Sequence, residues 1–248
     1  MLSVCLKGRR IRFFRRFIMI GIIGAMDKEV EELKASMDAV SVFEKAGMEF
    51  YNGILEGKGV VIVRSGVGKV NAAACTQLLI DKFNPDVIVN TGIAGSLDAK
   101  INIGDIVLST DALEHDMDVT GLGYKKGIIP DQDVSIFVAD EKIRKIAKES
   151  CEKVNTDIAV FEGRVVSGDQ FISGREKKDE IKKEFDGLCT EMEGASIAHV
   201  SYLNNVPFLI IRAISDKADD SANEDYPSFQ KKAIKHSVSL VKEMIKNM

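Results

Sequence analysis

Short apolar runs alternate with amphipathic stretches along most of this chain, and this alternation constrains the fold more than any other feature. The runs at residues 19–24, 86–90 and 207–214 lack polar alternation, as do strands that are covered on both faces. Residues 27–38 and 69–83, in contrast, have apolar positions at helical spacing. The alternation predicts an α/β domain with helices on both faces of a mostly parallel or mixed sheet.

The remaining segments extend the same pattern to the C-terminus. Further strands are expected at residues 48–55, 60–64, 105–109 (running on toward 119) and 158–166, and further helices at 140–154, 173–185, 193–204 and 227–246. No internal repeat, low-complexity tract or linker interrupts the pattern, so residues 19–248 are expected to form one domain. Ligands of such folds bind beyond the carboxyl ends of the strands, and functional residues are therefore expected just after strands.

Charge is unevenly distributed along the chain. The 248 residues carry 34 basic and 38 acidic side chains, a net charge of −4, and residues 1–18 hold six of the basic ones. The remainder has 34 − 6 = 28 basic against 38 acidic side chains, a net charge of −10. An acidic body repels the phosphate backbone, so nucleic acid is not an expected partner.

Residues 1–18 form a basic N-terminal extension that the domain does not need. Met19 is an alternative start of translation, and otherwise the extension is an arm outside the fold. A signal peptide is disfavoured because no small-residue cleavage site follows the apolar run Phe17–Met26. That run is also shorter than the ~20 residues that span a bilayer, so no membrane association is expected.

The cysteines point to a reducing compartment. Cys5, Cys75, Cys151 and Cys189 are far apart and form no CxxC pair. A reduced protein in the cytoplasm is the simplest interpretation.

Carboxylates near predicted strand ends are the strongest candidates for chemistry. Glu29 lies in the first helical turn after the first strand, where a base could face a cleft, although acidic residues also favour helix N-termini. Glu191 and Glu193 flank Met192, so an extended backbone would point both carboxylates to one face, suited to a sugar diol. Asp216 ends a buried strand, where desolvation would raise its pKa toward that of a general acid, with Ser215 to orient it.

Glycine-rich segments carry weaker signals. Residues 21–26 lack the full dinucleotide-binding spacing, and Ser65–Lys69 lacks the ending of a phosphate loop. Asn90–Ser96 is a small-residue segment after a buried strand that would let a ligand approach the backbone, or an ordinary loop. Glu114–Asp118 contains His115 among carboxylates, but no zinc-site spacing is present, so a metal is not favoured.

In order, these segments resemble the bacterial 5′-methylthioadenosine/S-adenosylhomocysteine nucleosidases of the nucleoside phosphorylase superfamily. The resemblance covers about Met19 to the C-terminus, and it rests on the ordered set of short motifs rather than on any one of them. The motifs are residues 21–26 with Glu29, then 65–69, 90–95, 115–124, 167–172, 191–193 and 212–216. The resemblance implies a three-layer αβα fold with a central mixed, mostly parallel twisted sheet, as in nucleoside phosphorylases.

The resemblance also implies catalytic roles for matching positions. Glu29 matches the carboxylate that activates water, and Glu193 matches the one that holds the ribose hydroxyls. Asp216 matches the acid that protonates adenine N7, and Ser215 the residue that orients it. The implied reaction is hydrolysis of the N-glycosidic bond of 5′-methylthioadenosine and S-adenosylhomocysteine, with 5′-deoxyadenosine as a further substrate, in methionine salvage.

Further positions match the substrate pocket, and no metal or organic cofactor is implied. They are Met26, Val67 and Val119 as apolar lining, Ile93, Ala94 and Gly95 in the small-residue segment, Phe171 and Ile172 at adenine, Glu191 and Met192 at ribose, Arg212 near the water and Tyr226 as an aromatic lid. Tyr124 and Pro130 match positions that close the neighbouring subunit's 5′ pocket, which implies a homodimer. Ile93 and Leu122 depart from residues that some members carry there, serine and phenylalanine.

Two alternatives remain open on the sequence. A nucleoside phosphorylase would need a cationic phosphate pocket, for which Arg64 and Lys69 are available, whereas Glu29 would repel the anion. A nucleoside-binding protein without catalysis would share the fold, but it would need neither an acid nor a base.

Overall fold

The computed structural model describes residues 4–6, 9–11 and 18–248 of the chain. Most of the predicted basic extension, residues 1–3, 7–8 and 12–17, lies outside the described residues, so the division at residue 18 stays a prediction. In the described part of this extension, β1 (Val4–Leu6) and β2 (Arg9–Ile11) pair as an antiparallel two-stranded sheet. No helix of the described ranges is both long and apolar enough to cross a membrane.

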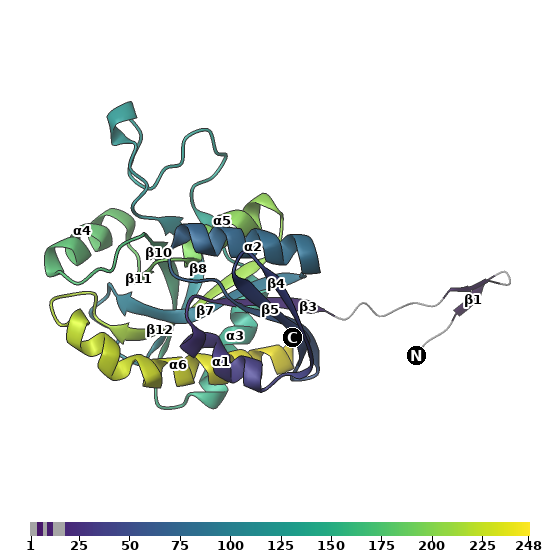
Figure 1. The fold of residues 1–248 in the computed structure, drawn as a ribbon. Coiled ribbons are helices and arrows are strands. Elements are labelled where there is room, and N and C mark those ends of the chain that lie inside the picture. The colour runs from purple at the N-terminus through teal and green to yellow at the C-terminus, as the bar shows by residue number, and fades with distance from the viewer. Residues whose placement is uncertain (1–3, 7–8, 12–17) are drawn as a thin grey trace.

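A ten-stranded mixed sheet forms the centre of the domain (Figure 1). Its strands are β3 (Met19–Gly24), β4 (Asp38–Lys45), β5 (Met48–Leu55), β6 (Lys58–Arg64), β7 (Val87–Ser96), β8 (Ile106–Glu114), β9 (Phe137–Val138), β10 (Val160–Ser167), β11 (Cys189–Glu191) and β12 (Phe208–Asp216). Their order is β11-β10-β8-β12-β7-β3-β6-β5-β4, and β9 adds to β8. Strands β12, β7, β3 and β6 run parallel to one another, and so do β8, β10 and β11. The pairs β8–β12, β5–β6 and β4–β5 are antiparallel.

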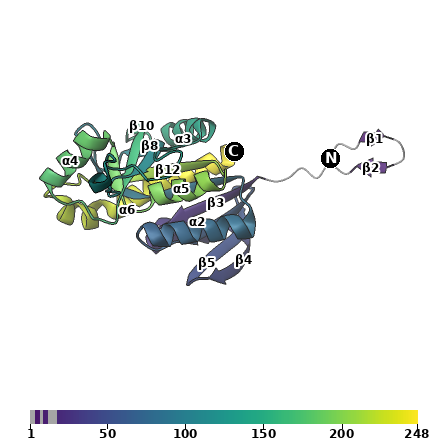
Figure 2. The same ribbon diagram turned by 90° about the horizontal axis from the view of Figure 1, so that it is seen from above.

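Helices cover both faces of this sheet, which confirms the predicted three-layer αβα architecture (Figures 1 and 2). The helices are α1 (Asp27–Ala35), α2 (Lys69–Phe83), α3 (Glu141–Val154), α4 (Arg175–Phe185), α5 (Gly194–Leu203) and α6 (Ala222–Asn247). In the layers, α2 packs on α5, and α6 packs on α1, α3 and strand β12. The central strands are buried along their length, as the apolar runs predict.

The sheet closes on itself at one end, which the alternation pattern does not predict. Strand β11 pairs in parallel with β10, and it also pairs antiparallel with the last residues of β7, through Cys189 with Ser96 and Thr190 with Gly95. The carboxyl ends of β7, β10, β11 and β12 therefore meet around one hollow. Segments that are far apart in the sequence reach this hollow together.

Three sequence expectations need correction. Residues 90–96 are not a loop, because strand β7 continues through Ser96 and is buried throughout. Residues 38–45 form the edge strand β4, which the sequence does not reveal because its side chains are mostly exposed and form no apolar run. Helix α6 begins at Ala222, so that Pro227 lies inside it as its sixth residue, although a proline there removes a backbone hydrogen bond and more often marks a helix start.

Candidate active site

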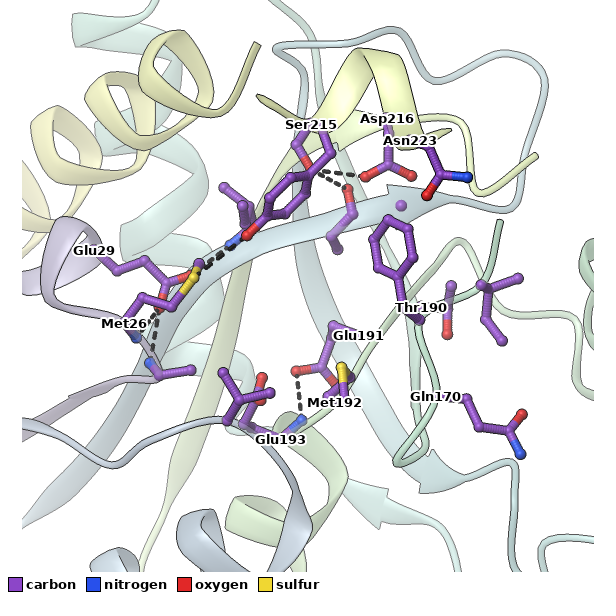
Figure 3. A pocket seen from close by; sticks show the side chains of 18 residues that line it. Met26, Glu29, Gln170, Thr190, Glu191, Met192, Glu193, Ser215, Asp216 and Asn223 are labelled. Atoms are coloured by element: carbon purple, nitrogen blue, oxygen red, sulfur yellow. Dashed lines mark hydrogen bonds between the residues drawn. The ribbon is translucent and has the colours of Figure 1, made fainter. Parts of the chain in front are cut away.

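The hollow at the closed end of the sheet is a cavity of about 410 Å³ (Figure 3). It has the size and the mixed apolar and polar lining of a small-molecule site. Its lining residues are Ala25, Met26, Glu29, Val67, Ile93, Ala94, Gly95, Gln170, Phe171, Ile172, Thr190, Glu191, Met192, Glu193, Ser215, Asp216, Asn223 and Tyr226. Glu29, Glu193 and Asp216 thus lie around one cavity, as the sequence-based hypothesis requires.

Glu29 is held at the end of β3 by backbone hydrogen bonds. Its Oε2 accepts from the N–H groups of Ala25 (2.7 Å) and Met26 (2.9 Å), and its Oε1 accepts from that of Ile93 (3.2 Å). Burial raises the pKa of Glu29, while the nearby charge of Arg212 and these hydrogen bonds oppose the shift. The side chain therefore both caps helix α1 and presents a carboxylate of raised basicity to the cavity.

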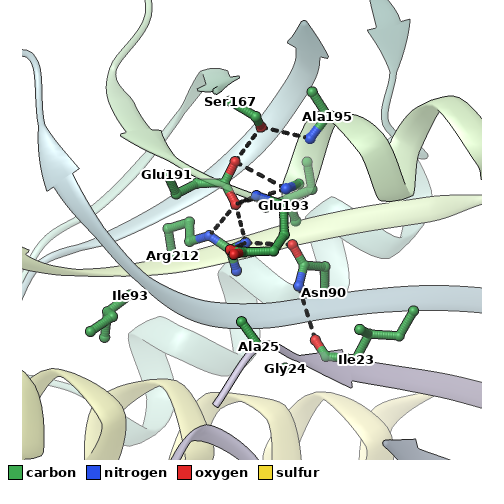
Figure 4. Close-up of polar contacts among 12 residues, drawn as sticks. Ile23, Gly24, Ala25, Asn90, Ile93, Ser167, Glu191, Glu193, Ala195 and Arg212 are labelled. Atoms are coloured by element: carbon green, nitrogen blue, oxygen red, sulfur yellow. Dashed lines mark hydrogen bonds and ion pairs between the residues drawn. The ribbon is translucent and has the colours of Figure 1, made fainter. Parts of the chain in front are cut away.

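Glu191 and Glu193 have different roles although only Met192 separates them. Glu191 ends β11, and its carboxylate binds Ser167, the backbone N–H of Gly194 and the guanidinium of Arg212 (Figure 4). Burial alone would raise the pKa of Glu191, but Arg212 and these hydrogen bonds hold it below its ordinary value. Glu191 lines the cavity, but its oxygens are committed to the protein, so it is not a free ligand for a sugar diol.

Glu193 is the carboxylate left to face a ligand. Its Oε1 accepts from the N–H of Gly68 at 2.8 Å, and its Oε2 lies 4.0 Å from Arg212. Burial and the negative charge of Glu191 raise the pKa of Glu193 to about 7, against the opposing charge of Arg212. Its remaining oxygen can accept hydrogen bonds from a ligand's hydroxyl groups.

Asp216 lies across the cavity, at the last residue of β12 (Figure 3). Its Oδ2 accepts from the hydroxyl of Ser215 at 2.9 Å, and its Oδ1 accepts from the N–H of Ala218 at 2.8 Å. Burial raises its pKa, although both hydrogen bonds favour the carboxylate. The position and the raised pKa suit a proton donor to a ligand in the cavity.

An aromatic and sulfur-containing wall completes the lining. The rings of Phe171 and Tyr226 meet edge to face with centroids 5.8 Å apart, and the Tyr226 hydroxyl lies 3.4 Å from the sulfur of Met26. Gln230 donates to the Tyr226 hydroxyl at 2.9 Å. Phe171 is about half exposed at the cavity, so its ring is available to stack on a planar ligand.

Two of the residues predicted for this cavity do not line it: Arg212 is buried behind it as the partner of Glu191, and Val119 lies on the segment that joins β8 to β9. Tyr124 and Pro130, which were predicted for the neighbouring subunit's pocket, lie on the same segment. Four lining residues were missed by sequence reasoning: Ala25, Gln170, Thr190 and Asn223. Ala25, Gln170 and Thr190 each adjoin a predicted site residue, whereas Asn223 carries no motif signal.

Arg64 and Lys69, the two residues that could form a cationic phosphate pocket, are both paired with carboxylates. Arg64 pairs with Asp27 on the surface, and Lys69 Nζ binds Glu114 (2.9 Å) and Asp116 (2.7 Å). Among the described residues that line the cavity there is no lysine or arginine. The arrangement therefore offers an acid, a base and a carboxylate for hydroxyl groups, but no free cation for phosphate.

Known proteins are similar to this chain over most of its length. The phosphorylase superfamily matches residues 19–246. The 5′-methylthioadenosine/S-adenosylhomocysteine nucleosidase of Staphylococcus aureus strain JH9 is 42% identical over 231 residues, 93% of this chain and 100% of the relative.

Two solved structures are similar over nearly the whole domain. One is the nucleosidase of the same name from Neisseria meningitidis in complex with methylthio-immucillin-A, with a TM-score of 0.89 and 38% identity over 93% of this chain and 99% of that one. The other is a futalosine hydrolase of Helicobacter pylori, with a TM-score of 0.87 and 31% identity over 94% of this chain and 99% of that one.

The raised pKa of Glu193 makes stability depend on pH in a defined window. The folded state binds the proton of the Glu193 carboxyl group more tightly than the unfolded state does. The resulting contribution to the free energy of unfolding is complete below about pH 4.5 and is lost as pH rises through about 7. Replacing Glu193→Gln removes the titration. We expect urea unfolding to show that the free energy of unfolding of the variant increases relative to that of the wild type as pH rises, by on the order of 1–3 kcal/mol at pH 9.

The control for this measurement is Glu162→Gln on the surface. Hydrogen bonds from Lys148 hold the pKa of Glu162 low, with help from Arg144, so its titration falls below the window. A difference between Glu193→Gln and wild type that is the same at pH 5 and pH 9 would show that Glu193 has an ordinary pKa.

Proposed function

Because this chain belongs to the phosphorylase superfamily and, within it, to the 5′-methylthioadenosine/S-adenosylhomocysteine nucleosidases, we propose how its own residues carry out hydrolysis of these nucleosides. The enzyme is an N-ribosyl hydrolase that cleaves the N-glycosidic bond of 5′-methylthioadenosine and S-adenosylhomocysteine and releases adenine and the 5′-thioribose. The observation that carries the mechanism is the grouping of Glu29, Glu193 and Asp216 around one cavity whose described lining has no cation.

Asp216 is the proposed general acid. Cleavage leaves negative charge on the purine, and a proton from Asp216 to N7 neutralises the leaving group. Burial raises the pKa of Asp216, which favours the protonated form needed for this step, and the Ser215 hydroxyl fixes the carboxyl group. Phe171 would stack on adenine, and the backbone of Ile172 would bind its edge.

Glu193 and Glu29 act on the ribose side. Positive charge develops on the ribose ring as the bond breaks, and buried carboxylates stabilise it electrostatically. Glu193, anchored by Gly68, would accept hydrogen bonds from the ribose hydroxyls above Met192. Glu29 would take a proton from the attacking water, which adds to the ribose and completes the hydrolysis.

The apolar part of the lining suits a 5′ thioether. Met26, Val67 and Met192 offer flexible and aliphatic surface beside the ribose position. We expect 5′-deoxyadenosine, which lacks the thioether, to be a substrate as well. The place of the reaction in methionine salvage follows from the same substrates.

Two further proposals concern the surroundings of the enzyme. Cys75, Cys151 and Cys189 are free and buried, which supports a reducing, cytoplasmic location. A homodimer is supported by exposed apolar side chains on neighbouring elements, since α2 and β9 both contact α5: Val70 (80% exposed) on α2, Leu203 (55%) on α5 and Val138 (75%) on β9. The segment bearing Leu122, Tyr124 and Pro130 extends outward on this side (Figure 1), where it could close a partner's 5′ pocket.

Phosphate dependence tests the reaction type. We expect the purified protein to release adenine from 5′-methylthioadenosine at the same rate in phosphate-free buffer and in 50 mM phosphate, because no free cation faces the cavity. Chromatography should identify free 5-methylthioribose as the other product. Strict dependence on phosphate, with a ribose 1-phosphate as product, would contradict hydrolysis.

Asp216→Asn tests the proposed acid. The amide keeps the shape and the hydrogen bond from Ala218, but it cannot give up a proton, so we expect turnover to fall about 10²–10⁴-fold. Affinity for a non-hydrolysable analogue, measured by calorimetry, should change less than about tenfold. Asp220→Asn, on the nearby surface, is the matched control, and unchanged turnover in Asp216→Asn would eliminate Asp216 as the acid.

Val138→Glu tests the dimer. The proposed interface would bury this charge without a partner, so we expect analytical ultracentrifugation to find about 27 kDa for the variant and twice that for the wild type. Activity should fall with dissociation, since each pocket would lose the partner's Tyr124 and Pro130. Val42→Glu on edge strand β4 is the control. A wild type that sediments as a monomer refutes the proposal.

A further inference from the structure

Lys69, the first residue of α2, joins four segments around the active site without lining the cavity. Its Nζ bridges Glu114 and Asp116 at the end of β8. Its backbone N–H donates to Asp169 at 2.8 Å, and its carbonyl accepts from the hydroxyl of Ser196 on α5 at 2.9 Å. The side chain is largely buried, so the two ion pairs are partly shielded from solvent.

Three of these contacts form a closed cycle, here called the Lys69 clamp: Lys69, Asp116 and Asp169. Lys69 Nζ donates to Oδ1 of Asp116, Oδ2 of Asp116 accepts from the N–H of Asp169 at 2.9 Å, and Oδ1 of Asp169 accepts from the N–H of Lys69. Each residue thus contacts the other two, and removal of the side chain of Lys69 or of Asp169 opens the cycle by breaking one of its three bonds. Such a cycle fixes α2 relative to the loop after β10.

Both elements that the clamp fixes carry site residues. Gly68, directly before Lys69, donates its N–H to Glu193, and it has a left-handed φ of 95° that favours glycine. A Cβ on Gly68 would also lie 3.0 Å from Oδ1 of Asp169. On the other side, Phe171 and Ile172 follow Asp169 in the loop and line the cavity. The clamp therefore sets the distance between the carboxylate proposed for ribose and the ring proposed for adenine.

We propose that Lys69 is a positioning residue of this nucleosidase, which holds Glu193 and the loop of Phe171 in register for one nucleoside. The proposal rests on the proposed function for the identity of the ligand. Without the cation, Glu114 and Asp116 would repel each other at the end of β8, and the tie to Asp169 would loosen. Displacements of about 1 Å in a site can lower the rate about 10²-fold, so a residue outside the cavity can affect catalysis.

The test compares Lys69→Met, Asp169→Ala and the double variant with the wild type. For each, kcat and KM for 5′-methylthioadenosine and the inhibition constant of adenine are measured. We expect each single variant to raise KM and the adenine inhibition constant about tenfold. Because the two residues act in one cycle, the double variant should be within about threefold of the worse single variant, instead of about 100-fold from wild type.

These readouts separate positioning from stability. A variant that is only less stable contains less active enzyme, which lowers the apparent kcat but leaves KM and the adenine inhibition constant unchanged. Lys148→Met is the matched control, since it removes a lysine from Glu162 on the surface away from the cavity, and it should match the wild type. If Lys69→Met does not fold, Asp169→Ala decides the question, because it leaves the Lys69–Asp116 ion pair in place.

Two results would overturn the inference: an unchanged KM and adenine inhibition constant in Asp169→Ala, or effects that multiply fully in the double variant. A failure of the proposed function looks different, since the wild type itself would release no adenine. In that case calorimetric titration of adenine into wild type and Asp169→Ala still tests the clamp, with about tenfold weaker binding expected for the variant and equal affinity contradicting the proposal.

Discussion

The buried guanidinium of Arg212 is the interaction on which the active site depends. Four carboxylates, Glu29, Glu191, Glu193 and Asp216, line one small cavity, and uncompensated negative charges at such depth would be prohibitively unstable. Arg212 binds Glu191 directly, donates to Asn90 at 2.5 Å and lowers the pKa of Glu29 and Glu193 below what burial alone would give. One ion pair thus keeps Glu191 charged, while Glu193 and Glu29 are left with raised proton affinity.

The glycines of β7 make room for this arrangement. A Cβ on Gly92 would lie 2.6 Å from Oε1 of Glu29 and 2.9 Å from Nη1 of Arg212, and one on Gly95 would lie 2.7 Å from Oδ1 of Asp216. The sequence suggested that these small residues let a ligand approach the backbone. In the structure the segment is a buried strand crossed by the protein's own charged side chains, and Ile93, Ala94 and Gly95 within it line the cavity.

Elements with strong local signals can be predicted from the sequence, whereas elements whose structure depends on pairing with distant strands cannot. Helix Lys69–Phe83 was predicted with the observed ends, because the glycine at its N-cap and the periodic apolar positions are local. The edge strand β4 and the closure of β11 onto β7 depend on distant partners and leave no apolar run. The candidate carboxylates were identified, but the separate tasks of Glu191 and Glu193 depend on Arg212, which is 19 or more residues away in the chain.

Structural and catalytic interpretations of one residue need not compete. Glu29 accepts hydrogen bonds at the start of α1, as a capping glutamate does, and the same bonds aim its carboxylate into the cavity. Asp216 similarly stabilises the turn after β12 through Ala218 while its pKa is raised by burial. A helix cap or turn is rigid because its backbone groups are fixed, so a carboxylate that takes this role is already oriented for chemistry. The local structure that stabilises each of these elements therefore also positions the proposed base and the proposed acid.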